Sequence, residues 1–419
     1  MPRKQSDLFN NILTVVSGTV IAQLIPILLQ PILRRMYSPE DFGLFGVYTS
    51  IIGVVTVIST LRYSQTINIP KNDIVSTNLF ALSFITAFIF YVLLTIFIIF
   101  FNDSILKISG IPSNRSLFLY FIPFSAFLFS TFEVINFWLI RKKEFKLAAL
   151  NKIYRRSTEG IINVGFGLRG SYVGLIFGDI IGNIANVFSG IRRLKHIKFN
   201  FRNVSIRKIF FVARKYSDMP KFNLVPQTLN SICLFLPPFL INKFYSSETA
   251  GYFNLTLLVL NIPIVFVGNS ISDVLIQRIS DRRNNKLSIK KDFFNLVIVL
   301  SIASFIMIFF IMLVGEWAFG FVFGNQWKIS GSYAKFYVWA SAIRLIASPL
   351  NVVFIIFQEV RRFAIWQVGY FLSMLSLTFL GFLNFNSFLI SITLINVIFY
   401  SIVFFMSKNV VINYEKSLN

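Results

Sequence analysis

The chain has very few of the residues from which disulfide frameworks, metal sites and acid–base catalytic centres are built. Its 419 residues include one cysteine, Cys233, and one histidine, His196. A disulfide framework and a Cys/His metal site are therefore excluded. The sequence also has no P-loop and no Asp-x-Asp pair for a nucleotide sugar. We predict that the protein is not an enzyme and that it needs no metal or cofactor.

Charge is scarce as well, whereas apolar residues are abundant. Charged residues make up 14% of the chain and hydrophobic residues 55%, while a typical soluble domain carries about 25% charged residues. A membrane-spanning helix needs about 20 mostly apolar residues, and such stretches follow one another along the chain. We predict an all-α membrane protein with twelve transmembrane helices over residues 12–33, 43–61, 76–101, 116–140, 147–168, 171–190, 219–241, 251–276, 293–315, 332–357, 363–383 and 388–406.

The basic residues are concentrated in alternate connections between these spans. The formal net charge is +23, with 40 Lys and Arg against 17 Asp and Glu. If the N-terminus is cytoplasmic, the inside segments carry 27 of the Lys and Arg and the outside segments carry 7. Because basic residues are retained in cytoplasmic loops, we predict that both termini are cytoplasmic. This distribution explains the positive charge without a nucleic-acid partner.

Two segments almost half a chain apart resemble each other. A shift of 208 residues aligns residues 34–45 with residues 242–253 and gives five identities in twelve positions. The duplication predicts two six-helix lobes of parallel topology, residues 1–208 and residues 209–419, with substrate bound between the halves. The serine shared by both copies is predicted to cap the start of a helix, with an acidic residue in its first turn.

Polar residues also recur at helical spacing inside the predicted spans, in both halves of the chain. In the span 147–168 one stripe consists of Lys152, Arg155, Arg156, Glu159 and Asn163. In the span 332–357 another consists of Tyr337, Ser341, Arg344, Ser348 and Asn351. Charge at membrane depth is costly and therefore faces protein or a water-filled cavity. We predict a hydrated cavity shared by the two halves.

The cationic members of these stripes suit an anionic substrate, because the planar guanidinium of arginine binds two phosphate oxygens at once. The predicted substrate-binding residues of the spans are Lys152, Arg155, Arg156, Arg344, Asn223 and Gln227. Four acids either pair with the arginines or carry protons, namely Glu133, Glu159, Asp179 and Asp273. For any single Asn or Gln, a hydrogen bond between helices is the simpler explanation.

Several motifs resemble one known family. The runs Ser17–Gln23, Leu33–Gly43 and Thr60–Tyr63 resemble the polysaccharide flippase family, the Wzx-type transporters of O-antigen and capsule repeat units. This family belongs to the multidrug/oligosaccharidyl-lipid/polysaccharide exporter (MOP) superfamily. The segment Phe323–Gly331 is similar to the Phe-Gly-x-x-Trp-x-x-Ala-Gly segment of the family.

The resemblance implies a V-shaped transporter with two lobes that works by alternating access. Its substrate would be undecaprenyl-diphosphate-linked oligosaccharide, moved from the cytoplasmic to the outer leaflet of a bacterial plasma (inner) membrane. Arg62 would first capture the diphosphate. Besides membrane lipids, a polysaccharide polymerase and a chain-length regulator would be partners in O-antigen and lipopolysaccharide biosynthesis. The chain departs from the family at Ser64 and Gln65, where glutamate is common, and at Ser330, which replaces alanine.

Two other functions fit part of this pattern. A drug or metabolite antiporter of the same superfamily would have the same helices, although cationic stripes argue against the export of cations. A membrane-embedded glycosyltransferase or polymerase also has many spans. Such enzymes usually carry a large external loop, whereas the longest predicted outside connection here has about 16 residues.

Overall fold

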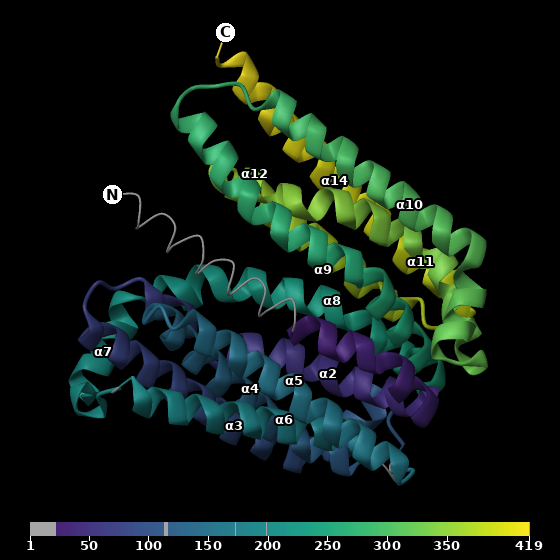
Figure 1. Ribbon diagram of the computed structural model, residues 1–419, viewed down its shortest axis with the longest axis horizontal. Coiled ribbons are helices and arrows are strands. Elements are labelled where there is room, and N and C mark those ends of the chain that lie inside the picture. The colour runs from purple at the N-terminus through teal and green to yellow at the C-terminus, as the bar shows by residue number, and fades with distance from the viewer. Residues whose placement is uncertain (1–21, 113–115, 172, 198, 419) are drawn as a thin grey trace. The chain divides into compact units, whose positions relative to one another are not determined.

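The computed structural model describes residues 22–112, 116–171, 173–197 and 199–418 (Figure 1). The side chains of residues 196, 201, 267–277, 355 and 360 are not described. Within the described residues the chain is helical and contains no strand. It divides into two compact units, residues 1–248 and residues 249–419.

Unit 1 contains the helices of the first half and the first long helix of the second half. After a helix over residues 22–36, it consists of α2 (Pro39–Ser59), η1 (Tyr63–Asn68), α3 (Asp73–Ser109), α4 (Leu117–Arg141), α5 (Phe145–Leu168), α6 (Gly174–His196), η3 (Phe201–Asn203), α7 (Ile206–Lys215), η4 (Met219–Asn223) and α8 (Leu224–Phe244). Helix α8 packs on α2 and α3; for example, Asn242 Nδ2 donates to the Ser109 carbonyl at 2.7 Å. The boundary predicted between the two duplicated lobes, at residues 208 and 209, precedes α8. It stays a prediction.

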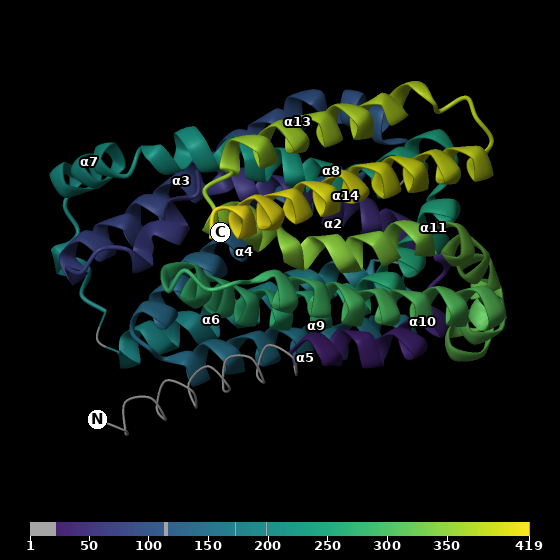
Figure 2. The same ribbon diagram turned by 90° about the horizontal axis from the view of Figure 1, so that it is seen from above.

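Unit 2 contains the remaining helices. They are α9 (Ser247–Asn284), α10 (Lys290–Phe323), η5 (Asn325–Trp327), α11 (Lys328–Ala347), η6 (Ser348–Asn351), α12 (Val352–Ile356), α13 (Val360–Ser376), η7 (Leu377–Phe379) and α14 (Phe385–Lys416). Helix α11 packs on α10 and on α14. Helix α14 lies between α11 and α13 (Figure 2).

The prediction of an all-α membrane protein is confirmed. In the described part of the chain, nine helices are long and apolar enough to cross a membrane. Helices α5 and α13 occupy two further predicted spans but are not among these nine helices. Helix α5 carries too many charges, and α13, at 17 residues, is too short. The first half of the predicted span 12–33 lies outside the described residues.

One short helix was not predicted. Helix α7 lies in the basic segment 191–218, at one end of the helices of unit 1 (Figure 1). It buries Val212, while Ile206 and Phe210 are exposed beside Arg207 and Lys208. A search for spanning stretches misses it because its 10 residues are too few to cross a bilayer.

The duplicated segments begin equivalent helices. Helix α2 begins at Pro39 and α9 at Ser247, which are 208 residues apart as the alignment requires. Ser38 is the N-cap of α2, and a capping box joins it to Asp41: Ser38 Oγ accepts from the Asp41 backbone, and Asp41 Oδ2 accepts from the Ser38 backbone. The predicted capping role of Ser38 is thus confirmed, and it satisfies backbone groups that a helix start leaves unpaired.

The segment Phe323–Gly331 forms the tight connection between α10 and α11. Gly324 ends α10 with a φ of 110°, a conformation that favours glycine. Trp327 is fully buried. A Cβ on Gly331 would lie 2.6 Å from Cα of Glu316, so glycine lets the two helices approach closely.

Replacing Gly331 by alanine should therefore destabilise the protein, by about 1–3 kcal/mol as for other overpacked sites. The matched control is Gly315→Ala on the facing helix, where the new Cβ would meet its nearest neighbour at an ordinary 3.4 Å. We expect a lower thermal midpoint of the purified protein for Gly331→Ala and no decrease for Gly315→Ala. Equal midpoints for wild type and Gly331→Ala would contradict this account of the connection.

Candidate functional site

Two of the arginines predicted to bind substrate are paired with carboxylates inside unit 1. Arg155 Nη2 lies 3.2 Å from Asp179 Oδ1 on α6. Arg156 Nη1 lies 2.8 Å from Glu159 Oε2, one turn further along α5. We call these four side chains the charge cluster. Its two cations are balanced by two anions, so the acids compensate the charge of this part of the α5 stripe.

Asp179 is the point at which four helices meet. The hydroxyls of Tyr48 on α2 and Ser125 on α4 each lie 3.2 Å from Asp179 Oδ2. The same two hydroxyls lie 2.5 Å from each other. Together with Arg155 on α5, these groups give the carboxylate partners from three other helices. Sequence analysis missed Tyr48 and Ser125, because isolated hydroxyls in apolar spans show no periodic pattern.

Close packing of α5 on α6 buries the two acids of this charge cluster. A Cβ on Gly182 would lie 3.0 Å from the Glu159 Cβ, and a Cβ on Gly178 would clash with the side-chain amide of Asn163. The spacing of the two glycines, four residues apart, is typical of helices that approach closely in membranes. The side chains of Asp179 and Glu159 consequently retain only 10% and 12% of their exposure. At this depth an ion pair that loses one partner is costly.

A small cavity with a partly polar lining adjoins the charge cluster. It has a volume of about 40 Å³, and its polar lining consists of Gln30, Arg156, Glu159 and Asn163. A polar space of this size has room for water. The carboxylate of Glu159 can therefore be hydrated, which is consistent with the predicted role of this acid in carrying protons. That role stays a prediction.

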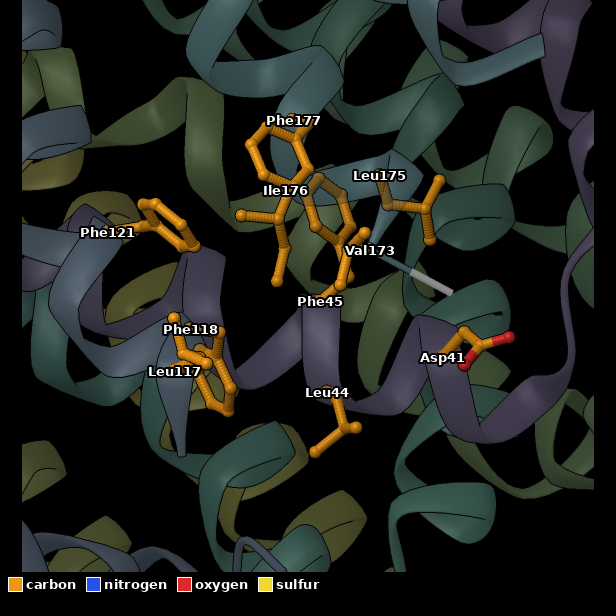
Figure 3. A pocket seen from close by; sticks show the side chains of 10 residues that line it. All are labelled: Asp41, Leu44, Phe45, Leu117, Phe118, Phe121, Val173, Leu175, Ile176 and Phe177. Atoms are coloured by element: carbon orange, nitrogen blue, oxygen red, sulfur yellow. The ribbon is translucent and has the colours of Figure 1, made fainter. Parts of the chain in front are cut away.

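Another cavity of unit 1 has a different character (Figure 3). Its volume is about 60 Å³, and its lining is apolar except for Asp41. Figure 3 shows the rings of Phe45, Phe118, Phe121 and Phe177 around it. The carboxylate of Asp41 already accepts the capping-box hydrogen bonds. Because this lining offers no free polar group to a phosphate or a sugar, we assign no function to the cavity.

Arg62, predicted to capture a diphosphate, lies between α2 and η1 and has a left-handed backbone with a φ of 64°. Its guanidinium is partly buried, and among the described residues its Nε has no hydrogen-bond partner. Burial lowers the pKa of Arg62 from its ordinary value, and the nearby carboxylate of Glu133 on α4 partly offsets this shift. Glu133, one of the predicted ion-pair residues, thus lies near Arg62. It is not a member of the charge cluster.

The other predicted binding residues of unit 1 are more scattered. Lys152 is partly buried on α5, one turn before the two arginines of the charge cluster. Asn223 is the last residue of η4, and its Oδ1 is buried without a hydrogen-bond partner among the described residues. Gln227 is exposed on α8. Their role in substrate binding stays a prediction.

In unit 2, Arg344 of α11 lies among three tyrosines. Tyr337 is two turns earlier on α11, Tyr370 is on α13 and Tyr400 is on α14, and all three are buried. Each interacts electrostatically with the guanidinium of Arg344. Arg344 Cζ lies 5.9 Å from the centroid of the Tyr400 ring, within the range of cation–π contacts. We call these four side chains the arginine–tyrosine cluster.

No carboxylate pairs with Arg344 among the side chains that the structure describes. The side chain of Asp273, predicted as a coupling or ion-pair residue, lies outside the described residues. Asn396 is close to the arginine–tyrosine cluster, because Tyr370 Oη donates to Asn396 Oδ1 at 2.9 Å. Sequence analysis missed Tyr370, Tyr400 and Asn396, which lie on helices other than that of Arg344.

The two clusters suit different chemistry. The charge cluster contains two buried acids held by cations and hydroxyls, and such carboxylates can bind or release a proton. The arginine–tyrosine cluster offers a guanidinium whose charge is not balanced by a described acid, and it therefore suits an anion. In the described part of the chain, no group of His, Cys, Asp and Glu is placed to hold a metal ion.

One family model matches the chain over residues 32–332, and its description is polysaccharide biosynthesis protein. The match covers most of the sequence and includes the whole charge cluster, whereas the arginine–tyrosine cluster lies beyond its end. Among curated proteins, none matches the chain.

Several solved structures have a similar fold. An inward-facing multidrug resistance transporter of the MATE family, in the MOP superfamily, matches with a TM-score of 0.74 and 15% identity, over 96% of this chain and 99% of that chain. An outward-facing MATE structure matches with a TM-score of 0.65 and 14% identity, over 96% of both chains. A MOP superfamily transporter from Pyrococcus furiosus, described by the reverse polarity of its binding pocket, matches with a TM-score of 0.64 and 14% identity, over 96% of this chain and 95% of that chain.

Proposed function

Because the chain belongs to the polysaccharide biosynthesis protein family, we propose that it is the flippase for a lipid-linked oligosaccharide. It is a multi-pass membrane transporter with the MOP superfamily fold, and it is not an enzyme. In this proposal an undecaprenyl-diphosphate-linked repeat unit passes from the cytoplasmic to the outer leaflet of a bacterial inner membrane by alternating access. Both termini lie in the cytoplasm.

The observation that carries the proposal is the environment of Arg344. A partly buried guanidinium that no described carboxylate neutralises attracts an anion, and arginine binds phosphate oxygens in pairs. The diphosphate of a lipid-linked sugar supplies such an anion. Tyr337, Tyr370 and Tyr400 add aromatic faces and hydroxyl groups around the bound group. Lys152 and Arg62 would contribute further positive charge along the path of the substrate.

The charge cluster of unit 1 is proposed to couple transport to an ion. Proton binding to Asp179 or Glu159 would release Arg155 or Arg156 from its partner, and a released arginine is free to bind the diphosphate. This mechanism makes binding by the arginines depend on the protonation of the acids.

A polysaccharide polymerase and a chain-length regulator would act after the flippase, in the assembly of O-antigen or a related surface polysaccharide.

A drug or metabolite antiporter is the second candidate function. It is favoured by the likeness of the fold to multidrug resistance transporters. Many exported drugs are cations, however, and an unbalanced guanidinium repels them. The two candidates therefore predict opposite preferences for the charge of the substrate.

Reconstitution of the purified protein into vesicles separates these candidates. The vesicles contain a lipid-linked oligosaccharide with its diphosphate, and an impermeant glycosidase reports the fraction that reaches the outer leaflet. We expect the protein to make the inner-leaflet pool accessible. A cationic dye under the same ion gradient should not be transported. Transport of the dye without movement of the oligosaccharide would support the antiporter and overturn the flippase proposal.

A further inference from the structure

A groove opens on the exposed face of unit 1, between the beginning of α5 and the end of α6. Its volume is about 520 Å³, within the usual range for small-molecule sites. It is lined by Leu147 and Tyr154 of α5 and by Ala185, Phe188, Ser189, Arg192 and Arg193 of α6. Neither cluster described above contributes a residue to it.

Two guanidinium groups at this groove have no acidic partner among the residues that the structure describes. Arg193 Nε donates to Ser189 Oγ at 3.2 Å, one turn earlier on α6. Arg192 Cζ lies 4.2 Å from the centroid of the Phe188 ring. Among the described residues, neither arginine forms an ion pair, and the phenol of Tyr154 is the group that acts electrostatically on Arg193. The two cations are therefore oriented and available to an anion.

The remainder of the groove is apolar and continues into exposed apolar side chains of the same two helices. Tyr154 and Phe188 are 57% and 55% exposed, and Ile161, Ile184 and Ile191 are exposed on the same two helices. Large apolar side chains exposed along membrane-spanning helices contact hydrocarbon chains. An occupant of the groove thus meets positive charge at one end and an apolar wall along its length. A soluble phosphate would leave that wall uncovered, whereas a lipid covers it.

The arginines lie in the last turns of α6, at the end of the helix that the charge distribution places in the cytoplasm. The cytoplasmic leaflet contains anionic lipids, and basic pockets between transmembrane helices on that side bind their headgroups. We propose that this groove is a binding site for an anionic glycerophospholipid. The phosphate lies between Arg192 and Arg193, and the acyl chains lie along Phe188 and Tyr154. The proposal is independent of which substrate the protein transports.

Lipid binding to the full-length protein tests this site. Native mass spectrometry of the purified chain is followed while phosphatidylglycerol, phosphatidylcholine, inorganic phosphate or a prenyl diphosphate is added. We expect phosphatidylglycerol to bind more tightly than phosphatidylcholine. The double variant Arg192→Ala/Arg193→Ala should weaken its binding about tenfold or more, because a lost hydrogen bond to a charged group costs at least that factor.

Two further variants keep the test specific. Arg192→Lys/Arg193→Lys retains the charge and should restore most of the binding. Lys290→Ala/Lys291→Ala removes the same charge at two exposed lysines at the start of α10 and should bind as the wild type does. Three results would overturn the proposal. The first is an equal loss of lipid binding in the lysine-to-alanine control, and the second is unchanged lipid binding in the arginine-to-alanine variant. The third is equally tight binding of inorganic phosphate or prenyl diphosphate at this groove.

Discussion

Replacing Arg344 by alanine should reduce transport of the lipid-linked substrate by about 10- to 100-fold, the loss expected for one or two hydrogen bonds to a charged group. The guanidinium lies among three buried tyrosines and has no carboxylate partner among the described residues. Its removal therefore breaks no described ion pair, and the protein should stay folded in the membrane. The effect is measured as surface polysaccharide in cells whose membranes contain equal amounts of each variant.

Two comparisons show whether the geometry of Arg344 matters as well as its charge. Arg344→Lys should restore transport only in part, because an ammonium group is a point charge and cannot bind two phosphate oxygens as the planar guanidinium does. Arg361→Ala removes an arginine at an exposed position of α13 and should have no effect. Normal polysaccharide in the Arg344→Ala strain would exclude the arginine–tyrosine cluster as the anion site.

Breaking the Arg155–Asp179 pair should cost about 3–5 kcal/mol of stability, the usual penalty for leaving one buried charge without its partner. Both side chains are nearly buried, and Asp179 also contacts the hydroxyls of Tyr48 and Ser125. Asp179→Ala and Arg155→Ala should each lower the thermal midpoint of the purified protein strongly. The double variant should be more stable than either single variant, since it leaves neither charge unpaired.

The same variants separate structure from transport. If Arg155 also binds the diphosphate, the double variant regains stability but still fails to display polysaccharide. A matched control is Glu359→Ala, which breaks the more exposed pair of Glu359 with Arg362 and should cost about 0–1 kcal/mol. A double variant that is no more stable than the single variants would show that the two side chains do not act as a pair.

Helices could be predicted from the sequence better than the contacts between them. The stripe on α5 and the start of α2 at Pro39 follow from periodicity and capping, which are local properties of the chain. Asp179 was one of four acids predicted as possible partners of the arginines, but its pairing with Arg155 could not be assigned, because Asp179 is on another helix and its approach depends on the packing of α5 against Gly182. Helix α7 was missed because its length does not reach that of a span.

The arginine–tyrosine cluster shows the same limit. Tyr337 and Arg344 share one face of α11, so their proximity follows from a spacing of seven residues. Tyr370 and Tyr400 come from α13 and α14, and only the packing of these helices against each other brings them to Arg344. The sequence left open whether the acids pair with the arginines or carry protons; the Arg156–Glu159 pair lies within α5, whereas the Arg155–Asp179 pair depends on the packing of α5 on α6.

The most direct test of flipping is the state of the lipid-linked intermediates in cells that lack this gene. A flippase forms no covalent bond, so its loss should leave repeat units complete but on the cytoplasmic leaflet. The measurement combines mass analysis of the lipid-linked oligosaccharides with their accessibility to an impermeant probe. We predict full-length units that the probe does not reach. Units shortened by one sugar, or full-length units accessible from outside, would contradict the proposed function.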